Sequence, residues 1–347
     1  MTRRPKVSTM AASTIVASTM ARGLGSILLA GQIVIAAGSA AGAQDYPSNH
    51  YPARPVKIIV PAAPGGALDT ISRLLAHKVA ELWNQQFYIE NKPGANWIIG
   101  MDAAAKSAPD GYTLLFIASS GLTVIPFVFP NMPVDPLKDL APVTVATTTP
   151  FVLLANPNIP AKSIAELVDY IRANPGRLNH ASNSATTILV SELFKNQAKI
   201  DYVDINFRGA SEAIAATQAG TTQFCFVDLG SATSAIEGKT LRPLALTMPQ
   251  RYALAPDIPT FAEAGLPGVA VSSMTLVLAP ANVPGDIMRK LNGKFREALQ
   301  SPEVVDRLRA MDQVVAAGAV EGTTTALLQE AQQWKELIKE RNIHFGN

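Results

Sequence analysis

The stretch VPAAPGGALDTISRLLAHKVAEL, residues 60–82, contains the end of an apolar strand, two glycines and the start of a helix. The strand is residues 56–60, and the glycines are Gly65 and Gly66. The spacing of apolar residues predicts one buried helix face, formed by Ile71, Leu74, Leu75, Val79 and Leu82. Glycines between a buried strand and a helix are typical of a loop where a ligand approaches bare backbone. The stretch therefore predicts an α/β fold with a ligand-binding loop.

The same alternation of strand and helix continues to residue 118. Strands are predicted at 87–90 and 113–118, with a helix at 98–106 between them. Asp110-Gly111 marks the turn into the last of these strands. Together with the first strand and helix, these segments make a βαβαβ unit. Such a unit implies a parallel sheet that is covered by helices.

A second α/β unit follows, and the last third of the chain is predicted to be helical. The strands of this unit are predicted at 151–155, 202–206, 224–227 and 244–247, and its helices at 164–173, 185–197 and 210–219. Ser163–Glu166 and Thr260–Glu263 have the spacing of capping boxes, which mark helix starts. The Pro-rich segment 126–142 between the units is not typical of a flexible linker. The sequence therefore predicts two α/β halves followed by a helical tail.

The first 43 residues have the layout of a secretory signal. They contain four basic and no acidic residues, an apolar run at 27–37, and small residues that end at Ala43. A membrane anchor is the alternative, but this run is shorter than the roughly 20 residues that span a bilayer. We expect cleavage near Ala43, with Met20 as an alternative start. Cleavage changes the net charge from +2 to −2 and so removes electrostatic support for nucleic-acid binding.

The sequence contains no recognisable catalytic motif and no cluster of metal ligands. Cys225 is the only cysteine, which excludes an internal disulfide, and its apolar neighbours predict a buried strand. Of the four histidines (His50, His77, His180 and His344), only His180 is predicted near a loop at a strand end. A surface or structural role suits this lone histidine better than catalysis. We therefore expect no enzymatic activity, no cofactor and no metal.

Four loops are predicted at the carboxyl edge of the sheets. They are residues 64–67, 118–121, 182–187 and 228–231. Ligands of open α/β sheets bind outside the carboxyl ends of the strands, and helix N-termini favour anions. We therefore expect a cleft that binds a small carboxylate or another oxyanion. A phosphate site would have similar features.

Four segments together resemble the Bug family of periplasmic solute-binding receptors, relatives of the receptor of tripartite tricarboxylate transporters. They are YPARPVKIIVPAAPGGALDTISRLLA (51–76), ENKPGANWIIGMDAAAKSAPDGYTLL (90–115), VDPLKDLAPVT (134–144) and LAPDIPTFAEAGLPG (254–268). The resemblance extends from about Tyr51 to the C-terminal helices. It implies an α/β, type II periplasmic-binding-protein fold with two α/β lobes around a ligand cleft. One lobe would comprise residues 44–149 plus 272–347, and the other residues 150–271.

The resemblance also implies that loops of both lobes bind a small carboxylate through backbone amides and bridging waters. The implied ligand-binding residues are Ala62, Gly65, Gly66, Ala67, Asp69, Ser119 and Ser120 in the first lobe, and Asn183, Ser184, Ala185, Thr186, Arg208 and Asp228 in the second. Asp69 suits capping of the first helix as well as ligand contact. Arg208 lies either in the cleft, where it would hold a carboxylate bidentately, or outside it.

Several positions depart from the family's pattern in or near the implied cleft. Asn96-Trp97-Ile98 stands where the family has Gly-Gly-Asn. The segment 182–189 lacks the family's glycines and histidine, Phe207-Arg208-Gly209 replaces Tyr-Lys-Gly, and Met274 replaces an aromatic residue. Trp97 would wall off the pocket, stack on a ligand, or lie at the surface. These departures leave the identity of the ligand open.

We expect a periplasmic receptor that closes its lobes over a small organic anion, such as a di- or tricarboxylate or an aromatic acid. It would act as a monomer, serve uptake or sensing through a membrane permease or a sensor protein, and bind no nucleic acid. One alternative is a hydrolase or transferase on the same two-lobe scaffold, which needs a nucleophile with a partnered base. Another is the effector domain of a transcription regulator, which needs an N-terminal helix-turn-helix where this chain has a signal-like segment.

Overall fold

The computed structural model describes residues 50–343, so the predicted signal segment (1–43), its cleavage site at Ala43 and His344 lie outside the described residues. β1 (Val56–Val60) and α1 (Ala67–Trp83) occupy the predicted strand and helix. Ile71, Leu75 and Val79 of α1 are buried in the same apolar core as β1. The 3.6-residue period of the sequence therefore corresponds to the face of α1 that packs on the sheet.

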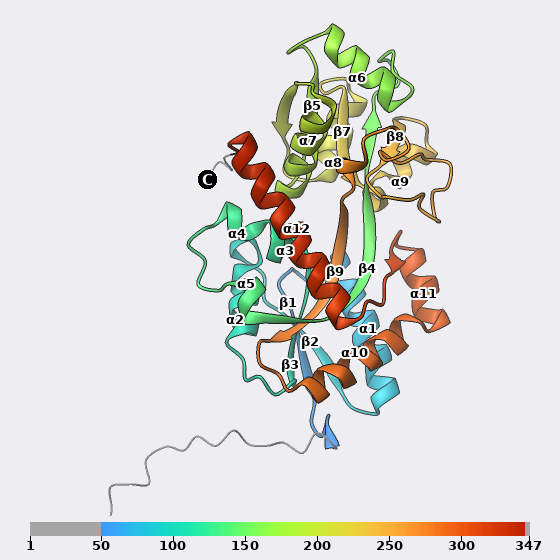
Figure 1. Cartoon of the computed structure of the whole chain (residues 1–347). Coiled ribbons are helices and arrows are strands. Elements are labelled where there is room, and N and C mark those ends of the chain that lie inside the picture. Colours follow the sequence, from blue (N-terminus) through green and yellow to red (C-terminus); the bar gives the residue numbers. More distant parts are fainter. Residues whose placement is uncertain (1–49, 344–347) are drawn as a thin grey trace, which may run out of the picture. The chain divides into compact units, whose positions relative to one another are not determined.

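A mixed sheet forms around β1 (Figure 1). Its strands are β1, β2 (Phe87–Asn91), β3 (Thr113–Ala118), β9 (Ser272–Pro280), the first part of β4 (Leu140–Ala155) and β10 (Val314–Val315). As predicted, β1 pairs in parallel with β2 and β3, whereas β9 runs antiparallel between β3 and β4. The longer helices of this part of the chain are α1, α2 (Ile98–Ala105), α10 (Gly285–Leu299) and α11 (Pro302–Arg309).

A second mixed sheet contains the last part of β4. Its other strands are β5 (Asn179–Ser182), β6 (Val203–Asn206), β7 (Phe224–Asp228) and β8 (Arg242–Leu246), and the helices beside them are α6 (Ile164–Ala173), α7 (Ala185–Ala198), α8 (Ala210–Gln218) and α9 (Leu229–Glu237). β5 is parallel to β6 and β7, whereas β4 is antiparallel to β7 and β8. Phe194 packs edge-on against Phe226 and Phe261 in the core of this part. Cys225 is fully buried on β7, as predicted, and burial raises the pKa of its thiol to about 12.

β4 belongs to both sheets and exchanges its partners between Pro150 and Phe151 (Figure 1). Pro150 pairs with Ser272 on β9, whereas Phe151 pairs with Asp228 on β7. The predicted lobe boundaries, 149/150 and 271/272, lie beside this exchange. Because the described residues belong to one compact unit, the boundaries remain a prediction.

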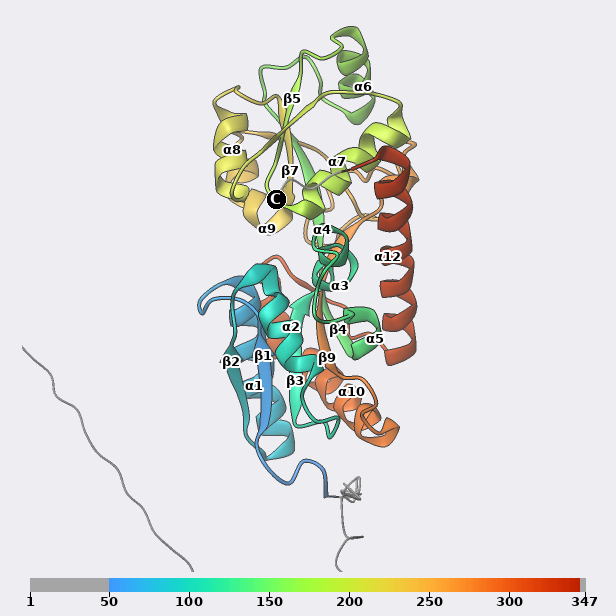
Figure 2. The same ribbon diagram turned by 90° about the vertical axis from the view of Figure 1, so that its left-hand side faces the viewer.

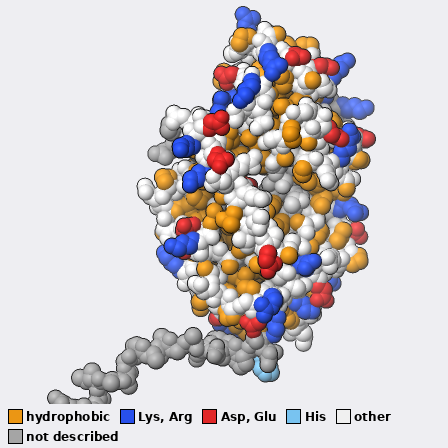
Figure 3. All heavy atoms as spheres, in the orientation of Figure 1, with side chains coloured by type: hydrophobic (Ala, Val, Ile, Leu, Met, Phe, Trp, Pro, Cys, Tyr) orange, Lys and Arg blue, Asp and Glu red, His pale blue; other side chains and the backbone are white. Residues whose placement is uncertain are grey.

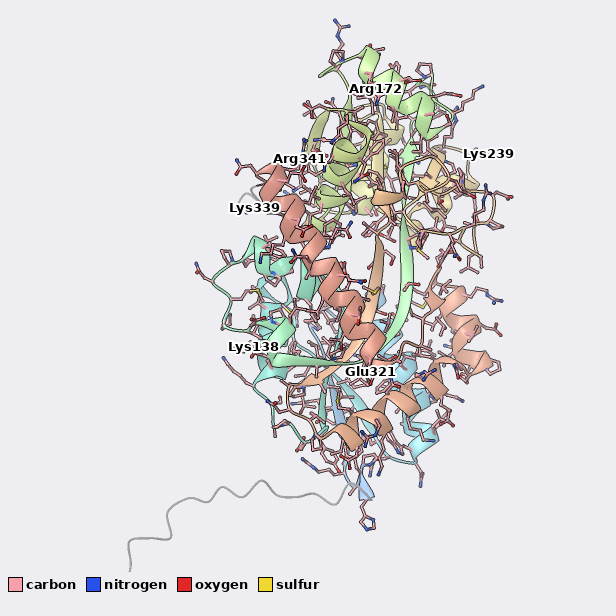
Figure 4. The ribbon with its side chains drawn as sticks, viewed as in Figure 1. Lys138, Arg172, Lys239, Glu321, Lys339 and Arg341 are labelled. Carbon is pink, nitrogen blue, oxygen red and sulfur yellow. The ribbon has the colours of Figure 1, made fainter. Side chains whose placement is uncertain are left out.

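The last helix, α12 (Val320–Arg341), contacts elements of both sheets. It packs on β4 and on α3 (Ser120–Thr123), and further along on α7 (Figure 2). Glu321 and Arg341 lie at its opposite ends (Figure 4). Arg341 Nε donates to Glu192 Oε2 of α7 over 3.0 Å. Short helical segments complete the described fold: η2 (Ala95–Trp97), α4 (Ile125–Val128), α5 (Pro136–Asp139) and η3 (Pro267–Val269).

The helix expected from the capping box at Thr260 does not form. Both hydrogen bonds of the box are present, since the amide of Glu263 donates to Thr260 and the amide of Thr260 donates to Glu263. The chain nevertheless makes only turns there, because Gly265 adopts a left-handed φ of 82° before a second helical turn can follow. Between residues 50 and 343, no helix combines the length and apolar character needed to cross a membrane.

Candidate ligand-binding site

A pocket of about 630 Å³ is lined by two segments that are far apart in the sequence. One, residues 96–129, supplies residues of η2, α3 and α4, and the other, residues 183–206, supplies residues around the start of α7 and Asn206 at the end of β6. The lining residues are Asn96, Trp97, Ser120, Val124, Ile125, Val128, Phe129, Asn183, Ser184, Ala185, Thr186, Ile188 and Asn206. A cavity of this size suits a small organic ligand, since such sites typically measure about 300–1,000 Å³.

The N-terminus of α7 forms one wall of the pocket. Ser184 is the N-cap, and its hydroxyl accepts from the amide of Thr187, while the Thr187 hydroxyl oxygen accepts from the amide of Ser184. Ala185 and Thr186 fill the first two helical positions, whose amides have no carbonyl partner within a helix. The partial positive charge of the helix end therefore meets the pocket where an anion can bind.

Asn183 places a buried acceptor beside this helix end. Its Oδ1 is inaccessible to solvent and has no hydrogen-bond partner among the described residues. Buried polar atoms are nearly always paired in folded proteins. The amide of Asn183 itself donates to the Thr187 hydroxyl over 2.9 Å.

The opposite wall contains a loop in an unusual backbone conformation. Ala95, Asn96 and Trp97 have φ angles of 44°, 50° and 74°. Residues with side chains rarely adopt positive φ, and such positions cost about 1–3 kcal/mol each. Trp97 also approaches Gly121, where an added Cβ would lie 3.3 Å from Trp97 Cε3. The loop thus holds an indole ring at the pocket wall in a conformation that glycine would adopt more easily.

The strand-to-helix loop of residues 61–66 is organised around Asp69. The Asp69 carboxylate accepts from the Gly65 amide (2.9 Å), from Arg73 Nε (2.9 Å) and from Asn91 Nδ2 (2.8 Å). The hydrogen bond from Arg73, followed by those from Gly65 and Asn91, outweighs burial and lowers the pKa of Asp69 to about 2. Asp69 therefore fixes the start of α1, and the Gly65 amide already has an acceptor within the chain.

Five of the predicted ligand-binding residues come together on the pocket: Ser120, Asn183, Ser184, Ala185 and Thr186. The others are not among its lining residues: Ala62, Gly65, Gly66, Ala67, Asp69, Ser119, Arg208 and Asp228. The Asp228 side chain caps α9 by accepting from the Ser231 amide. Arg208 is exposed, and its amide donates to Glu212 over 3.2 Å. Contact of any of these residues with a ligand remains a prediction.

Ser119 is buried directly behind the pocket wall, where it meets a carboxyl group of α12. Its hydroxyl donates to Glu330 Oε1 over 3.4 Å, and Trp334 Nε1 donates to the same oxygen over 3.4 Å. Glu330 Oε2 is buried without a partner among the described residues. Burial raises the pKa of Glu330 to about 7, although hydrogen bonds from Trp334, Ser119 and Thr123 oppose the change. Glu330 is therefore a carboxyl group that favours its neutral form below about pH 7 in the folded protein.

Glu330→Gln should stabilise the protein above pH 7 and flatten its pH dependence. The pKa is raised by folding, so the contribution of protonated Glu330 is complete below pH 4.5 and is lost as the pH rises through about 7. The expected loss is on the order of 2 kcal/mol in the free energy of unfolding. Urea unfolding at pH 5 and pH 8.5 measures it, with Glu336→Gln on the exposed face of α12 as the control. Parallel pH profiles for wild type and Glu330→Gln would contradict this assignment.

A buried polar network lies under α7, and sequence patterns alone did not indicate it. His180 is fully buried, Asp204 Oδ1 lies 2.6 Å from His180 Nδ1, and Lys195 Nζ pairs with Asp204 Oδ2. The Ser191 hydroxyl also donates to Asp204 Oδ1 over 2.8 Å. Burial lowers the pKa of His180 despite the nearby carboxylate. The His180 imidazole is therefore neutral and donates through Nδ1.

This network does not have the geometry of a catalytic triad. A triad histidine bonds the acid through one ring nitrogen and the nucleophile through the other. His180 Nε2 instead accepts from the Phe226 amide over 3.0 Å, and Ser182 lies on the same side of the ring as Asp204. The network therefore joins β5, β6 and α7 as a structural element, which agrees with the structural role expected for His180.

The residues that line the pocket are uncharged. Of its lining residues within the described part of the chain, the polar ones are asparagines, serines and a threonine, and the remainder are apolar. On the face shown in Figure 3, Lys and Arg side chains are interspersed with Asp and Glu. Hydroxyls, amides and a helix N-terminus are therefore the anion-binding groups that this pocket offers.

Two α/β sheets that share β4, with a ligand-sized pocket lined from both parts of the chain, define a solute-binding protein of the periplasmic type. Residues 71–343 match the family model described as the tripartite tricarboxylate transporter family receptor (TctC). The chain belongs to this family. Its members are solute-binding receptors rather than enzymes, which removes the hydrolase or transferase alternative.

One relative in sequence and two solved structures are similar to this chain over almost their whole length. Protein BugT of Bordetella pertussis is 33% identical over 293 residues, which is 84% of this chain and 90% of BugT. The structure of Rpa4515 from R. palustris with adipate has a TM-score of 0.71 and 28% identity, and covers 85% of this chain and 99% of that chain. MatC of Rhodopseudomonas palustris with bound malate has a TM-score of 0.67 and 29% identity, with 83% and 100% coverage. The predicted resemblance to the Bug family and the predicted fold class are confirmed.

Proposed function

We propose that this protein is a periplasmic receptor that captures a small carboxylate and delivers it for uptake or sensing. The observation that carries the proposal is the N-terminus of α7, which lies at the wall of an uncharged, ligand-sized pocket. Adipate and malate in the two structural relatives support a carboxylate as the ligand class. The signal-like layout of residues 1–43 supports export across the inner membrane.

Binding would proceed by closure of two lobes over the anion. The two pocket walls come from different parts of the chain, so contacts to both walls would favour the closed state. The strands β4 and β9 would carry the hinge, since β4 exchanges its partners at Pro150 and Phe151. The closed receptor would then dock as a monomer on a membrane permease or a sensor protein.

A thermal-shift screen of the chain from Gln44 onward tests the proposal. The panel comprises malate, adipate, citrate and phenylacetate, each beside the neutral primary amide of the same skeleton. A ligand that binds only the folded state raises the midpoint of thermal unfolding. At a free ligand concentration of 100 times Kd, it adds about 2.7 kcal/mol to the free energy of unfolding. We expect at least one acid to raise the midpoint and its amide not to do so. If no acid raises it, or if amides raise it equally, the protein is not a carboxylate receptor.

A further inference from the structure

Most of the large apolar residues of the pocket come from the part of the chain before α7, which also contributes the polar residues Asn96 and Ser120. Val124, Ile125, Val128 and Phe129 come from the segment through α4, and the indole of Trp97 comes from η2. The polar residues of α7 belong to the other segment. A ligand that contacts both segments would therefore meet the anion-binding start of α7 on one side and mainly apolar side chains on the other.

Among the described residues that line this pocket, none carries a positive charge that could pair with a second carboxylate. Lys, Arg and His are absent from its described lining residues. A carboxylate taken out of water without a counter-charge or full hydrogen bonding is strongly disfavoured. The start of α7 offers such hydrogen bonds for one anionic group. The lining therefore suits a ligand with one carboxylate and an uncharged body.

Trp97 occupies its position despite an unfavourable backbone conformation. Its φ of 74° follows φ angles of 44° at Ala95 and 50° at Asn96, so the loop keeps three side chains where glycines would fit without strain. The ring packs against the backbone of Gly121, at which a Cβ would meet Trp97 and Ile117. This packing fixes the indole beside the cavity. A strained position with an aromatic ring at a pocket wall indicates a role in the pocket.

We propose that Trp97 makes this receptor selective for monocarboxylates with a ring-sized apolar body over di- and tricarboxylates. This inference rests on the proposed function as a carboxylate receptor, and it specifies which class of carboxylate the pocket at the start of α7 would bind. The carboxylate binds at the start of α7, and the apolar body packs between Trp97 and the Val124–Phe129 segment. Aromatic side chains favour such contacts through their large apolar area and their ring geometry.

Calorimetric titration of wild type and Trp97→Gly with phenylacetate, malate and adipate tests the inference. We expect wild type to bind phenylacetate more tightly than malate or adipate. Trp97→Gly should weaken phenylacetate binding by roughly tenfold or more, because it removes an aromatic contact. It should leave the binding of malate and adipate unchanged or improved, and the unfolding midpoint unchanged or higher, because glycine accepts the positive φ.

Trp97→Gly both removes an aromatic ring and relieves backbone strain, and two further variants distinguish the effects of these changes on ligand affinity. Ala95→Gly relaxes a neighbouring positive φ without altering a lining residue, so its selectivity should equal that of wild type. Trp97→Phe retains a ring and should recover part of the phenylacetate affinity. If wild type prefers malate or adipate, or if Trp97→Phe and Trp97→Gly have the wild-type ratio of affinities, the inference fails while the receptor function stands. If wild type binds no acid, the receptor function itself fails.

Discussion

Ala185→Asp is expected to weaken carboxylate binding on the order of 100-fold while the fold remains stable. Ala185 is the first residue of α7 and lines the pocket, so the new carboxylate would stand where the ligand anion binds. Two like charges 4 Å apart repel by about 4 kcal/mol at an effective dielectric constant of 20, and solvent screening reduces this value. Titration calorimetry with the acid found in the screen measures the loss.

The same substitution should not harm α7 itself. An acidic side chain in the first turn of a helix is favourable by about 0.3–1 kcal/mol, because it meets the positive end of the helix dipole. Ala185→Asn is the matched control, since it has nearly the same size and no charge. We expect it to retain most of the affinity. Equal losses in both variants would mean that steric blocking, rather than charge, explains the effect, and unchanged affinity in Ala185→Asp would place the anion elsewhere.

Asp204→Ala is expected to destabilise the protein by about 3–5 kcal/mol, because it removes one partner of a buried ion pair. Burial raises the pKa of Asp204, but hydrogen bonds and charges from His180 and Lys195 outweigh it and hold the pKa well below its ordinary value. Without this carboxylate, Lys195 would lose a close anionic partner while its side chain is only 7% exposed. The free energy of unfolding in urea measures the change.

Asp201→Ala provides the matched control for the buried network. Asp201 lies 3.9 Å from the same Lys195 ammonium, but its side chain is 87% exposed. Exposed pairs contribute little, so we expect a change within about 0.5 kcal/mol. The two aspartates thus differ in burial and share a partner. A loss below about 1 kcal/mol for Asp204→Ala would show that the network is dispensable for stability.

The sequence predicted correctly those helices and strands whose apolar residues follow one clear period. β1, β3 and α1 lie where the pattern placed them because their apolar positions have a single period and their ends carry turn or capping residues. Strands in which polar residues or prolines interrupt the apolar pattern were missed or predicted too short. β5 (Asn179–Ser182) contains three polar residues, and the long-range partners that His180 and Ser182 find in Asp204 could not be read from the sequence. β4 begins at Leu140 rather than Phe151, because Pro142 and Pro150 obscured its strand pattern.

The α7 side of the candidate site was predicted, whereas Ser120 was the only ligand-binding residue predicted on the other side. The loop of residues 182–187 was predicted at the carboxyl edge of the sheet, and its residues Asn183–Thr186 do line the pocket. The wall formed by Val124, Ile125, Val128 and Phe129 was not predicted, because a Pro-rich apolar segment has no period that distinguishes a pocket from a core. Trp97 was singled out because it stands where the family has glycine. Its φ of 74° is a left-handed conformation that glycine adopts more easily than tryptophan. Long-range packing, which the sequence does not encode locally, placed these residues together.

The most direct test of the central claim is the response of the Ala185 and Thr186 backbone amides to a carboxylate. The measurement is a ¹H–¹⁵N correlation spectrum of the deuterated chain from Gln44 onward, titrated with the acid that gives the largest thermal shift. We predict saturable shifts of both amides with the Kd found by calorimetry, and no such response to the neutral primary amide of the same skeleton. Saturable binding that leaves Ala185 and Thr186 unchanged would contradict the assignment of this pocket as the carboxylate site.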